Sequence, residues 1–302
     1  MTRITELCLN HNKMDKRING RTIANAILEQ LKPRVKKLKK KPCLAVFSAG
    51  DHPASAVYIH QKQKAAQKIG AKLKQFKFKK ETSYQEFAEK LNQIVKDKKF
   101  SGVIIQKPLP VNLGHSSLDS IIPLKKDVDG LNPKSTFIPP VAKSVLRALD
   151  FIRIKKLGIR SLFLAGFPTQ ALINWLNHRF ILVIGRGQTA GQPIAKAFST
   201  QKIKFLIAHR ETEELAHFTK RAKIIISCVG KKIITPAMLK KKVILIGVGI
   251  KRIKKEVYQG DFDEEEIKDL VSYYTPTPGG IGPLTVASLM ENLIEATKQQ
   301  SK

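Results

Sequence analysis

The stretch Phe180-Ile-Leu-Val-Ile184-Gly-Arg-Gly-Gln-Thr-Ala-Gly191-Gln-Pro-Ile-Ala-Lys-Ala-Phe198 joins a short apolar run, a glycine turn and an amphipathic segment. The apolar run is bounded by glycine and rich in β-branched side chains, so it predicts a buried strand. The glycines predict a tight turn that opens into a helix. A strand, a turn and a helix in this order are typical of a βα unit in a parallel sheet.

The glycine turn resembles the dinucleotide fingerprint, in which the backbone approaches a pyrophosphate at a helix N-terminus. Its spacing is one residue longer than in that fingerprint. A second predicted strand, 204–208, ends at His209 and Arg210, where NAD-binding proteins usually carry an acid that holds the ribose 2′-hydroxyl. Because Arg210 and Arg186 could clamp a 2′-phosphate instead, we expect NADP, with NAD as the second choice. The alternative is two ordinary surface arginines in a basic chain.

Two further apolar runs, 222–230 and 243–249, also lead into glycines and would extend the same sheet. Ligands of parallel sheets gather at the carboxyl ends of the strands. The candidate cofactor-binding residues are therefore Gly185, Arg186, Gly187, Gly191, His209, Arg210, Val229, Gly230, Gly249 and Ile250.

The N-terminal half shows the same alternation of helices and strands. Apolar residues recur at helical spacing over 18–35, strands are predicted at 42–47, 71–78 and 102–106, and a helix is predicted at 86–95. This alternation predicts an α/β fold with parallel sheets covered by helices on both faces. The chain has 302 residues, 42% of them hydrophobic and 26% charged, which suits two globular domains.

Four residues of this half are candidates for chemistry. Tyr58 and Lys62 are four residues apart, so they share one face of a predicted helix that Ser55 could cap. Gln106 and Asp129 follow predicted strand ends and could meet them in one cleft. The alternatives are a solvated lysine on an amphipathic helix and an ordinary Asp-Gly turn.

The net charge of +31 is the outlier of the composition and favours polyanionic partners. The lysines are dispersed in short runs without zinc-finger or RNP-type aromatic patterns, so general lysine enrichment explains them equally well and we do not expect a dedicated nucleic-acid partner. No apolar run is long enough for a membrane span, and the first residues lack a signal peptide. The three cysteines are widely spaced, which predicts no metal site and a reducing cytoplasm.

Taken together, the ordered blocks of this chain resemble the bifunctional methylenetetrahydrofolate dehydrogenase/methenyltetrahydrofolate cyclohydrolase (FolD) family, roughly from Ile18 to the end. The matching blocks are Ile-Asn-Gly-Arg-Thr-Ile-Ala (18–24), Gly-Asp-His-Pro-Ala-Ser-Ala-Val-Tyr (50–58), Gln-Lys-Pro-Leu-Pro (106–110), Lys-Asp-Val-Asp-Gly (126–130), the glycine turn, and Thr-Pro-Thr-Pro-Gly-Gly-Ile-Gly-Pro-Leu-Thr-Val (275–286).

The resemblance implies two αβα domains with a cleft between them. A folate-binding catalytic domain would comprise 18–145 with 284–302, a Rossmann-type NAD(P)-binding domain 146–283, and a loose leader 1–17. It implies oxidation of 5,10-methylenetetrahydrofolate to the methenyl form, hydrolysis to 10-formyltetrahydrofolate, tetrahydrofolate ligands and a homodimer.

The resemblance also implies roles for individual residues. Lys62 takes the position of the catalytic lysine, Gln106 that of the glutamine oriented toward it, Tyr58 that of the tyrosine stacking on folate, and Asp129 that of the aspartate gripping the pterin. Further substrate-binding candidates are Gly279, Gly280 and Pro283.

The chain departs from the family pattern at several positions. Val141 replaces a threonine, Gly247 an aspartate, Gly187 a serine and Lys107 a leucine, and residues 159–178 form an unusually long connection before the cofactor strand. We expect an extra strand-like piece and a short helix containing Trp175 there. These departures leave open a cyclohydrolase with impaired dehydrogenase activity, and the charge leaves open a basic nucleic-acid-binding protein on the same scaffold.

Overall fold

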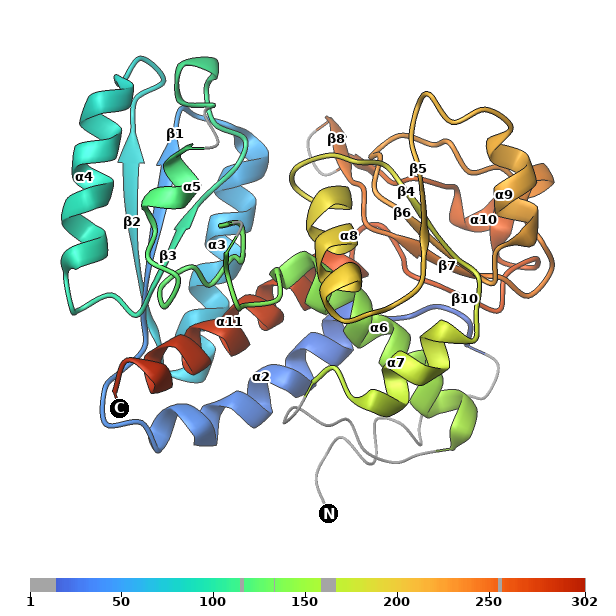
Figure 1. The fold of residues 1–302 in the computed structure, drawn as a ribbon, viewed down its shortest axis with the longest axis horizontal. Helices are drawn as coiled ribbons and strands as arrows, with labels where there is room; N and C mark the ends of the chain where they lie inside the picture. Colours follow the sequence, from blue (N-terminus) through green and yellow to red (C-terminus); the bar gives the residue numbers. More distant parts are fainter. Residues whose placement is uncertain (1–14, 115–116, 133, 159–166, 255–256, 302) are drawn as a thin grey trace. The chain divides into compact units, whose positions relative to one another are not determined.

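The computed structural model describes residues 15–114, 117–132, 134–158, 167–254 and 257–301 (Figure 1). The chain divides into two α/β units. One comprises Met1–Ala26 with Val141–Thr285, and the other comprises Ile27–Pro140 with Val286–Lys302. Helices α2 (Gly20–Lys36) and α11 (Ile281–Gln299) each contribute residues to both units.

The unit of Ile27–Pro140 and Val286–Lys302 is built on a parallel sheet in the order β2-β1-β3. Its strands are β1 (Cys43–Ala49), β2 (Lys72–Phe78) and β3 (Gly102–Ile105), joined by helices α3 (Pro53–Ile69) and α4 (Tyr84–Lys96). The central strand β1 is buried along its whole length. The predicted alternation of strands and helices in this half is therefore confirmed.

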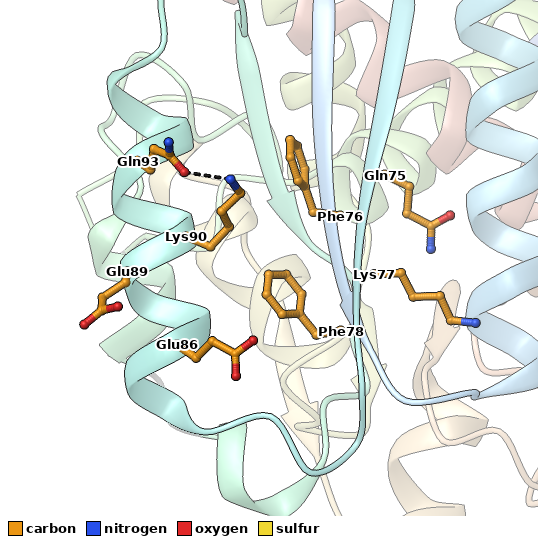
Figure 2. Close-up of a pocket in the computed structure, with 8 residues that line it drawn as sticks. All are labelled: Gln75, Phe76, Lys77, Phe78, Glu86, Glu89, Lys90 and Gln93. Carbon is orange, nitrogen blue, oxygen red and sulfur yellow. Dashed lines mark hydrogen bonds between the residues drawn. The ribbon is translucent and has the colours of Figure 1, made fainter.

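Aromatic packing fixes α4 against this sheet. The ring centroid of Phe87 in α4 lies 5.6 Å from that of Phe47 in β1 and 4.8 Å from that of Phe78 in β2. Figure 2 shows Phe76 and Phe78 pointing from the edge strand β2 toward α4. An open groove between β2 and α4 is lined by Gln75, Phe76, Lys77, Phe78, Glu86, Glu89, Lys90 and Gln93.

Helix α11 packs on β3 and holds the loop that follows. A Cβ atom on Gly102 would lie 2.9 Å from Leu293 and from Val128, so strand, helix and loop are in close contact. The Asn292 amide nitrogen donates to the carbonyls of Val128 and Ile138, both at 2.9 Å. These bonds anchor the loop that carries Asp129.

The other unit contains a five-stranded parallel sheet in the order β10-β7-β6-β4-β5. The strands are β4 (Ile181–Ile184), β5 (Leu206–Ala208), β6 (Ile224–Ser227), β7 (Ile244–Gly247) and β10 (Tyr273–Tyr274). The chain runs from β4 outward to β5 and then returns to the far side of β4 for β6. Such a reversal of strand order marks the ligand crevice of doubly wound sheets, here at the carboxyl ends of β4 and β6.

Several further elements complete the description. Arg17 forms a parallel bridge with Tyr274, so the last residues of the expected leader pair with the sheet, while 1–14 lie outside the described residues. The remaining elements are α5 (Ser117–Ile121), α6 (Pro140–Leu157), α8 (Gly191–Thr200), α9 (Leu215–Arg221), α10 (Glu264–Ile267), the hairpin β8 (Lys251–Lys254) and β9 (Val257–Gln259), and the 3₁₀ turns η1 (Val111–Leu113) and η2 (Pro236–Met238).

The long connection before β4 contains the expected short helix. Helix α7 (Gln170–Asn177) includes Trp175 and begins after Thr169, whose hydroxyl accepts a bond from the Leu172 amide. Asn177 binds the backbone of Lys202 and Lys204, which ties the end of α7 to the segment entering β5. The strand-like piece expected earlier in this connection falls on 159–166, outside the described residues.

Two local expectations can be compared directly with the structure. The Ser55 cap is wrong, because α3 starts after His52 with Pro53 in its first turn, and Ser55 lies inside the helix. Among the residues that the structure describes, no helix is long and apolar enough to cross a bilayer.

Candidate functional site

Lys62 is a buried residue of α3. Its ammonium nitrogen donates to the side-chain oxygen of Gln106 at 2.7 Å, and the residue is only 9% exposed. Ser55, Ile59, Ala65, Ala66 and Ile69 are also buried residues of α3, so Lys62 belongs to the packed face of the helix. The alternative of a solvated lysine is therefore excluded.

Gln106 is oriented by the backbone around it. It follows β3 directly, and its amide nitrogen donates to the Lys107 carbonyl at 2.7 Å. The Ser55 hydroxyl donates to the same carbonyl at 3.4 Å, which links α3 to this turn. With its nitrogen engaged, the amide presents its oxygen to Lys62.

Charged groups surround this pair. Burial lowers the pKa of Lys62, and the Asp129 carboxylate opposes that shift. Burial raises the pKa of Asp129, which Lys62 in turn lowers. Lys107 and Asp119 form an ion pair at 3.2 Å and act on Asp129 in opposite directions. Lys107, which departs from the family pattern, thus belongs to a charge network that includes Asp129.

The turn that carries Asp129 depends on Asp127, a residue that sequence reasoning missed. The Asp127 carboxylate accepts bonds from the amides of Leu131 at 3.3 Å and Asn132 at 3.0 Å, and the residue is 1% exposed. Burial raises the pKa of Asp127 to about 6. An aspartate shortly before an Asp-Gly turn is the sequence signal that could have suggested this role, because its side chain can bind the backbone that follows.

Tyr58 lies one helical turn before Lys62 in α3 and is half-buried. All four catalytic candidates thus belong to one unit. Hydrogen bonding joins Lys62 to Gln106, and electrostatic interaction joins Lys62 to Asp129. Tyr58 is related to Lys62 by its position on the helix.

The glycine turn after β4 has the close backbone approach that a dinucleotide site requires. A Cβ atom on Gly191 would lie 2.0 Å from the Gly185 carbonyl oxygen, so only glycine fits at the start of α8. Gly185 itself has φ +105° and lies beside the Cys228 carbonyl that follows β6. Gly187 has open space around it, so no steric demand explains the missing serine. These features fit a pyrophosphate at the N-terminus of α8.

The two arginines expected to bind the ribose 2′-phosphate lie close together, but both contact the carboxylate of Glu211. Arg186 Nη2 is 3.2 and 3.1 Å from the two carboxylate oxygens of Glu211, and Arg210 Nε is 3.3 Å from one of them. His209 Nδ1 accepts a bond from the Glu211 amide. Sequence reasoning missed Glu211, although an acid shortly after the second strand was the available signal.

Asp261 was also missed, and it organises the two loops after β6 and β7. Its carboxylate accepts bonds from the amides of Val229 at 2.9 Å, Gly230 at 2.7 Å and Gly249 at 2.8 Å. Burial raises the pKa of Asp261, while these amide bonds lower it. Because these three amides are engaged, this part of the predicted cofactor site can offer the exposed side chains of Val229 and Ile250.

The packing of Phe262 explains why glycine replaces the family aspartate at Gly247. A Cβ atom on Gly247 would lie 2.9 Å from Phe262 Cε1 and 3.2 Å from Cζ. Phe262 is buried in the core beside the sheet, so its ring has little room to move. The ring therefore excludes a side chain at position 247.

The remaining substrate-binding candidates lie in the unit that holds the five-stranded sheet. The Gly280 amide donates to the Pro276 carbonyl, and a Cβ atom on Gly20 would lie 1.8 Å from the Gly280 oxygen. Gly279 has φ +105°, and Pro283 lies in the first turn of α11. Val141, which replaces a threonine, lies in the first turn of α6, where its carbonyl accepts the Ser144 hydroxyl.

Comparison with known proteins places this chain in a family. Residues 18–129 match the "Tetrahydrofolate dehydrogenase/cyclohydrolase, catalytic domain", and residues 170–301 match the corresponding NAD(P)-binding domain. The chain is 32% identical over 289 residues to the bifunctional protein FolD of Anoxybacillus flavithermus, which covers 94% of this chain and 98% of the relative.

The chain belongs to the FolD family.

A second FolD relative, from Lactobacillus gasseri, is 33% identical over 300 residues. The match covers 95% of this chain and 99% of the length of the relative. The FolD enzyme of Campylobacter jejuni superposes with a TM-score of 0.81 at 29% identity, covering 93% of this chain and 98% of that one. The Trypanosoma brucei FolD, solved with NADP and an inhibitor, shares the fold with a TM-score of 0.80 at 22% identity over 94% and 97% of the two chains. The predicted family and the two-domain α/β fold class are confirmed.

Proposed function

We propose that this FolD-family chain oxidises 5,10-methylenetetrahydrofolate with NADP⁺ and hydrolyses the resulting methenyl form to 10-formyltetrahydrofolate. The observation that carries the proposal is the buried Lys62 held at 2.7 Å by the neutral amide of Gln106. Family membership supports both activities in one chain.

Lys62 is the proton-transfer group of the proposed hydrolysis. Water adds to the methenyl carbon and loses a proton. The bond from that carbon to one ring nitrogen then breaks as the nitrogen receives a proton, and the added hydroxyl loses its proton as the formyl carbonyl forms. A lysine serves this purpose when part of it is neutral near pH 7. Burial moves Lys62 toward that condition by lowering its pKa, and Gln106 orients the amine without adding a charge that would reverse the shift.

Asp129 and Tyr58 are the proposed folate ligands. Asp129 can accept bonds from the N–H groups of a pterin, and its anchored loop restricts its position. The half-buried Tyr58 ring offers a face on which a flat substrate can stack. Gly279, Gly280 and Pro283 would supply a rigid loop for the same substrate.

The glycine turn after β4 is the proposed dinucleotide site. Gly185, Gly191 and the N-terminus of α8 would hold the pyrophosphate, and Arg186 and Arg210 the ribose 2′-phosphate, while Val229 and Ile250 offer apolar contacts. When bound, the nicotinamide supplies the acceptor for a hydride. The protein's part in that step is chiefly alignment of two bound molecules.

We also propose a catalytic domain of 18–145 with 284–302, a Rossmann domain of 146–283, and a cytoplasmic homodimer. The free thiols of Cys43 and Cys228 support a reducing compartment. The homodimer rests on the family resemblance, and light scattering on the purified protein tests it by giving twice the mass of the chain.

Product identification tests the proposed reactions. Purified protein is given methylenetetrahydrofolate labelled at the one-carbon unit, together with NADP⁺, and the labelled folates are separated over time. The proposal expects label in 10-formyltetrahydrofolate with one NADPH formed per product. Label that stays in the methylene form would refute it.

A further inference from the structure

Glu211 is a feature of the dinucleotide site that the proposed NADP-dependent reaction does not use. Its carboxylate receives both Arg186, at 3.2 and 3.1 Å, and Arg210, at 3.3 Å. The Glu211 side chain is 55% exposed. Two cations thus converge on one accessible anion, which leaves the trio with a net charge of +1.

The backbone around Glu211 holds the acid in this place. The Glu211 amide donates to His209 Nδ1 at 3.3 Å, and the His209 amide donates to the Thr212 hydroxyl at 2.9 Å. The Thr212 amide closes a turn on the His209 carbonyl at 2.9 Å. Because Nδ1 of His209 accepts a bond here, the neutral tautomer that fits this turn carries its proton on Nε2.

The position of this turn in the sheet places Glu211 beside the glycine turn of the proposed dinucleotide site. β4 and β5 are parallel neighbours in which Ile184 pairs with Ala208. The Gly185 amide donates to the Ala208 carbonyl at 2.8 Å, so the glycine turn and the end of β5 are adjacent. In dinucleotide-binding sheets the residues after this second strand face the 2′ position of the adenosine ribose.

We propose that Glu211 sets the cofactor choice of this chain by opposing the 2′-phosphate of NADP and accepting a hydrogen bond from the 2′-hydroxyl of NAD. The inference rests on the proposed dinucleotide site. A 2′-phosphate carries close to two negative charges near neutral pH. It must either displace Glu211 from the arginines or bind beside a like charge. The exposed ion pairs of Glu211 are weak, so the phosphate can take the arginines from it. The carboxylate nevertheless stays on the same turn and repels the phosphate.

The consequence is that the chain uses both cofactors, with NADP binding weaker than two arginines alone would provide. Removing the negative charge of Glu211 frees both guanidinium groups for the phosphate. The same change replaces a charged acceptor for the NAD ribose hydroxyl with a weaker, neutral one. The ratio of the two affinities, rather than either affinity alone, therefore reports the role of Glu211.

Isothermal titration of NADP⁺ and NAD⁺ into wild type, Glu211→Gln and Glu213→Gln tests this assignment without relying on turnover. Glu213 is an exposed acid two residues away, so its variant makes the same change in net charge. We expect Glu211→Gln to tighten NADP⁺ about tenfold at low salt and to weaken NAD⁺ or leave it unchanged. Glu213→Gln should shift both by less than about twofold.

The outcomes separate this inference from the proposed function. Wild-type protein that binds both cofactors, with an affinity ratio unchanged in Glu211→Gln, overturns the role of Glu211 alone. Equal tightening of NADP⁺ by the two variants overturns it as well, because it shows a general charge effect. Wild-type protein that binds neither cofactor overturns the dinucleotide site and the inference together. Thermal melts matching wild type show that the variants are folded.

Discussion

The ammonium nitrogen of Lys62 lies 2.7 Å from the side-chain oxygen of Gln106, so a buried amine is held by a neutral acceptor. A carboxylate in that position would favour the charged amine strongly. The amide instead gives direction without charge, and burial lowers the pKa of Lys62. Gln106 therefore orients the Lys62 side chain, while burial lowers its pKa.

Replacing Gln106 with Glu should shift the pH dependence of methenyl hydrolysis to higher pH. The new carboxylate would stabilise the lysine cation, so a larger share of Lys62 would be charged at pH 7. We expect the rate at pH 7 to fall at least tenfold and to recover partly by pH 9. The exposed Gln93→Glu variant serves as the charge control. A parallel loss of rate at every pH would argue for a purely structural role of Gln106.

Replacing Lys62 with Met should abolish methenyl hydrolysis. Methionine keeps much of the apolar stem, but it has no group that can move a proton. General acid–base catalysis contributes about 10²–10⁴-fold, so the rate above the uncatalysed reaction should fall by at least about 10². The assay follows loss of methenyltetrahydrofolate supplied directly, with Lys64→Met on the exposed side of α3 as control. Near-native hydrolysis by Lys62→Met would refute the assigned role.

The catalytic half shows which features of the site could be predicted from the sequence. Four-residue spacing placed Tyr58 and Lys62 on one helix face, but spacing alone could not distinguish a buried lysine from a solvated one. That distinction depends on Gln106, which is distant in sequence and adjacent only once β3 pairs with β1. The role of Asp127 depends likewise on the conformation of its own turn.

Asp127→Asn should flatten the pH dependence of stability. Burial raises the folded-state pKa of Asp127 from 3.8 to about 6, so its stabilising contribution is complete below about pH 4 and is lost as pH rises through about 6. About two pKa units correspond to about 3 kcal/mol. Asparagine does not ionise. The unfolding midpoint of the variant should therefore rise relative to that of wild type as the pH increases from about 4 to about 7.

The exposed Asp51→Asn variant provides the matched control for that comparison. Its difference from wild type should change much less over the same pH interval, because the Asp51 side chain is 86% exposed and folding removes little water from it. Equal pH dependence in Asp127→Asn and wild type would show that the buried carboxyl is not the source of the effect.

Gly247→Ala should destabilise the protein by about 1–3 kcal/mol, because the new methyl group overlaps the Phe262 ring. Adding Phe262→Leu should recover part of that loss, and a double-mutant cycle from urea unfolding measures the coupling. Gly187→Ala is the control, since its Cβ would meet no atom within 4 Å. Independent, additive effects of the substitutions at 247 and 262 would contradict this explanation of the glycine.

The cofactor half shows a second limit of the sequence. The glycine turn and both arginines were recognisable, but Glu211 is separated from Arg186 in sequence and contacts it because β4 and β5 are neighbours. The same holds for Asp261, which binds the backbone of two loops that precede it in the chain. Contacts made across strands carry no local signature, whereas turns and helix faces do.

The most direct measurement of the proposed bifunctionality follows both steps in one preparation of purified protein. Methylenetetrahydrofolate is supplied with NADP⁺ or NAD⁺, methenyltetrahydrofolate is supplied in a parallel reaction, and cofactor reduction and methenyl absorbance are recorded together. We predict cofactor reduction in the first reaction and rapid loss of methenyl absorbance in the second. Ready methenyl hydrolysis without reduction of either cofactor would contradict the bifunctional assignment.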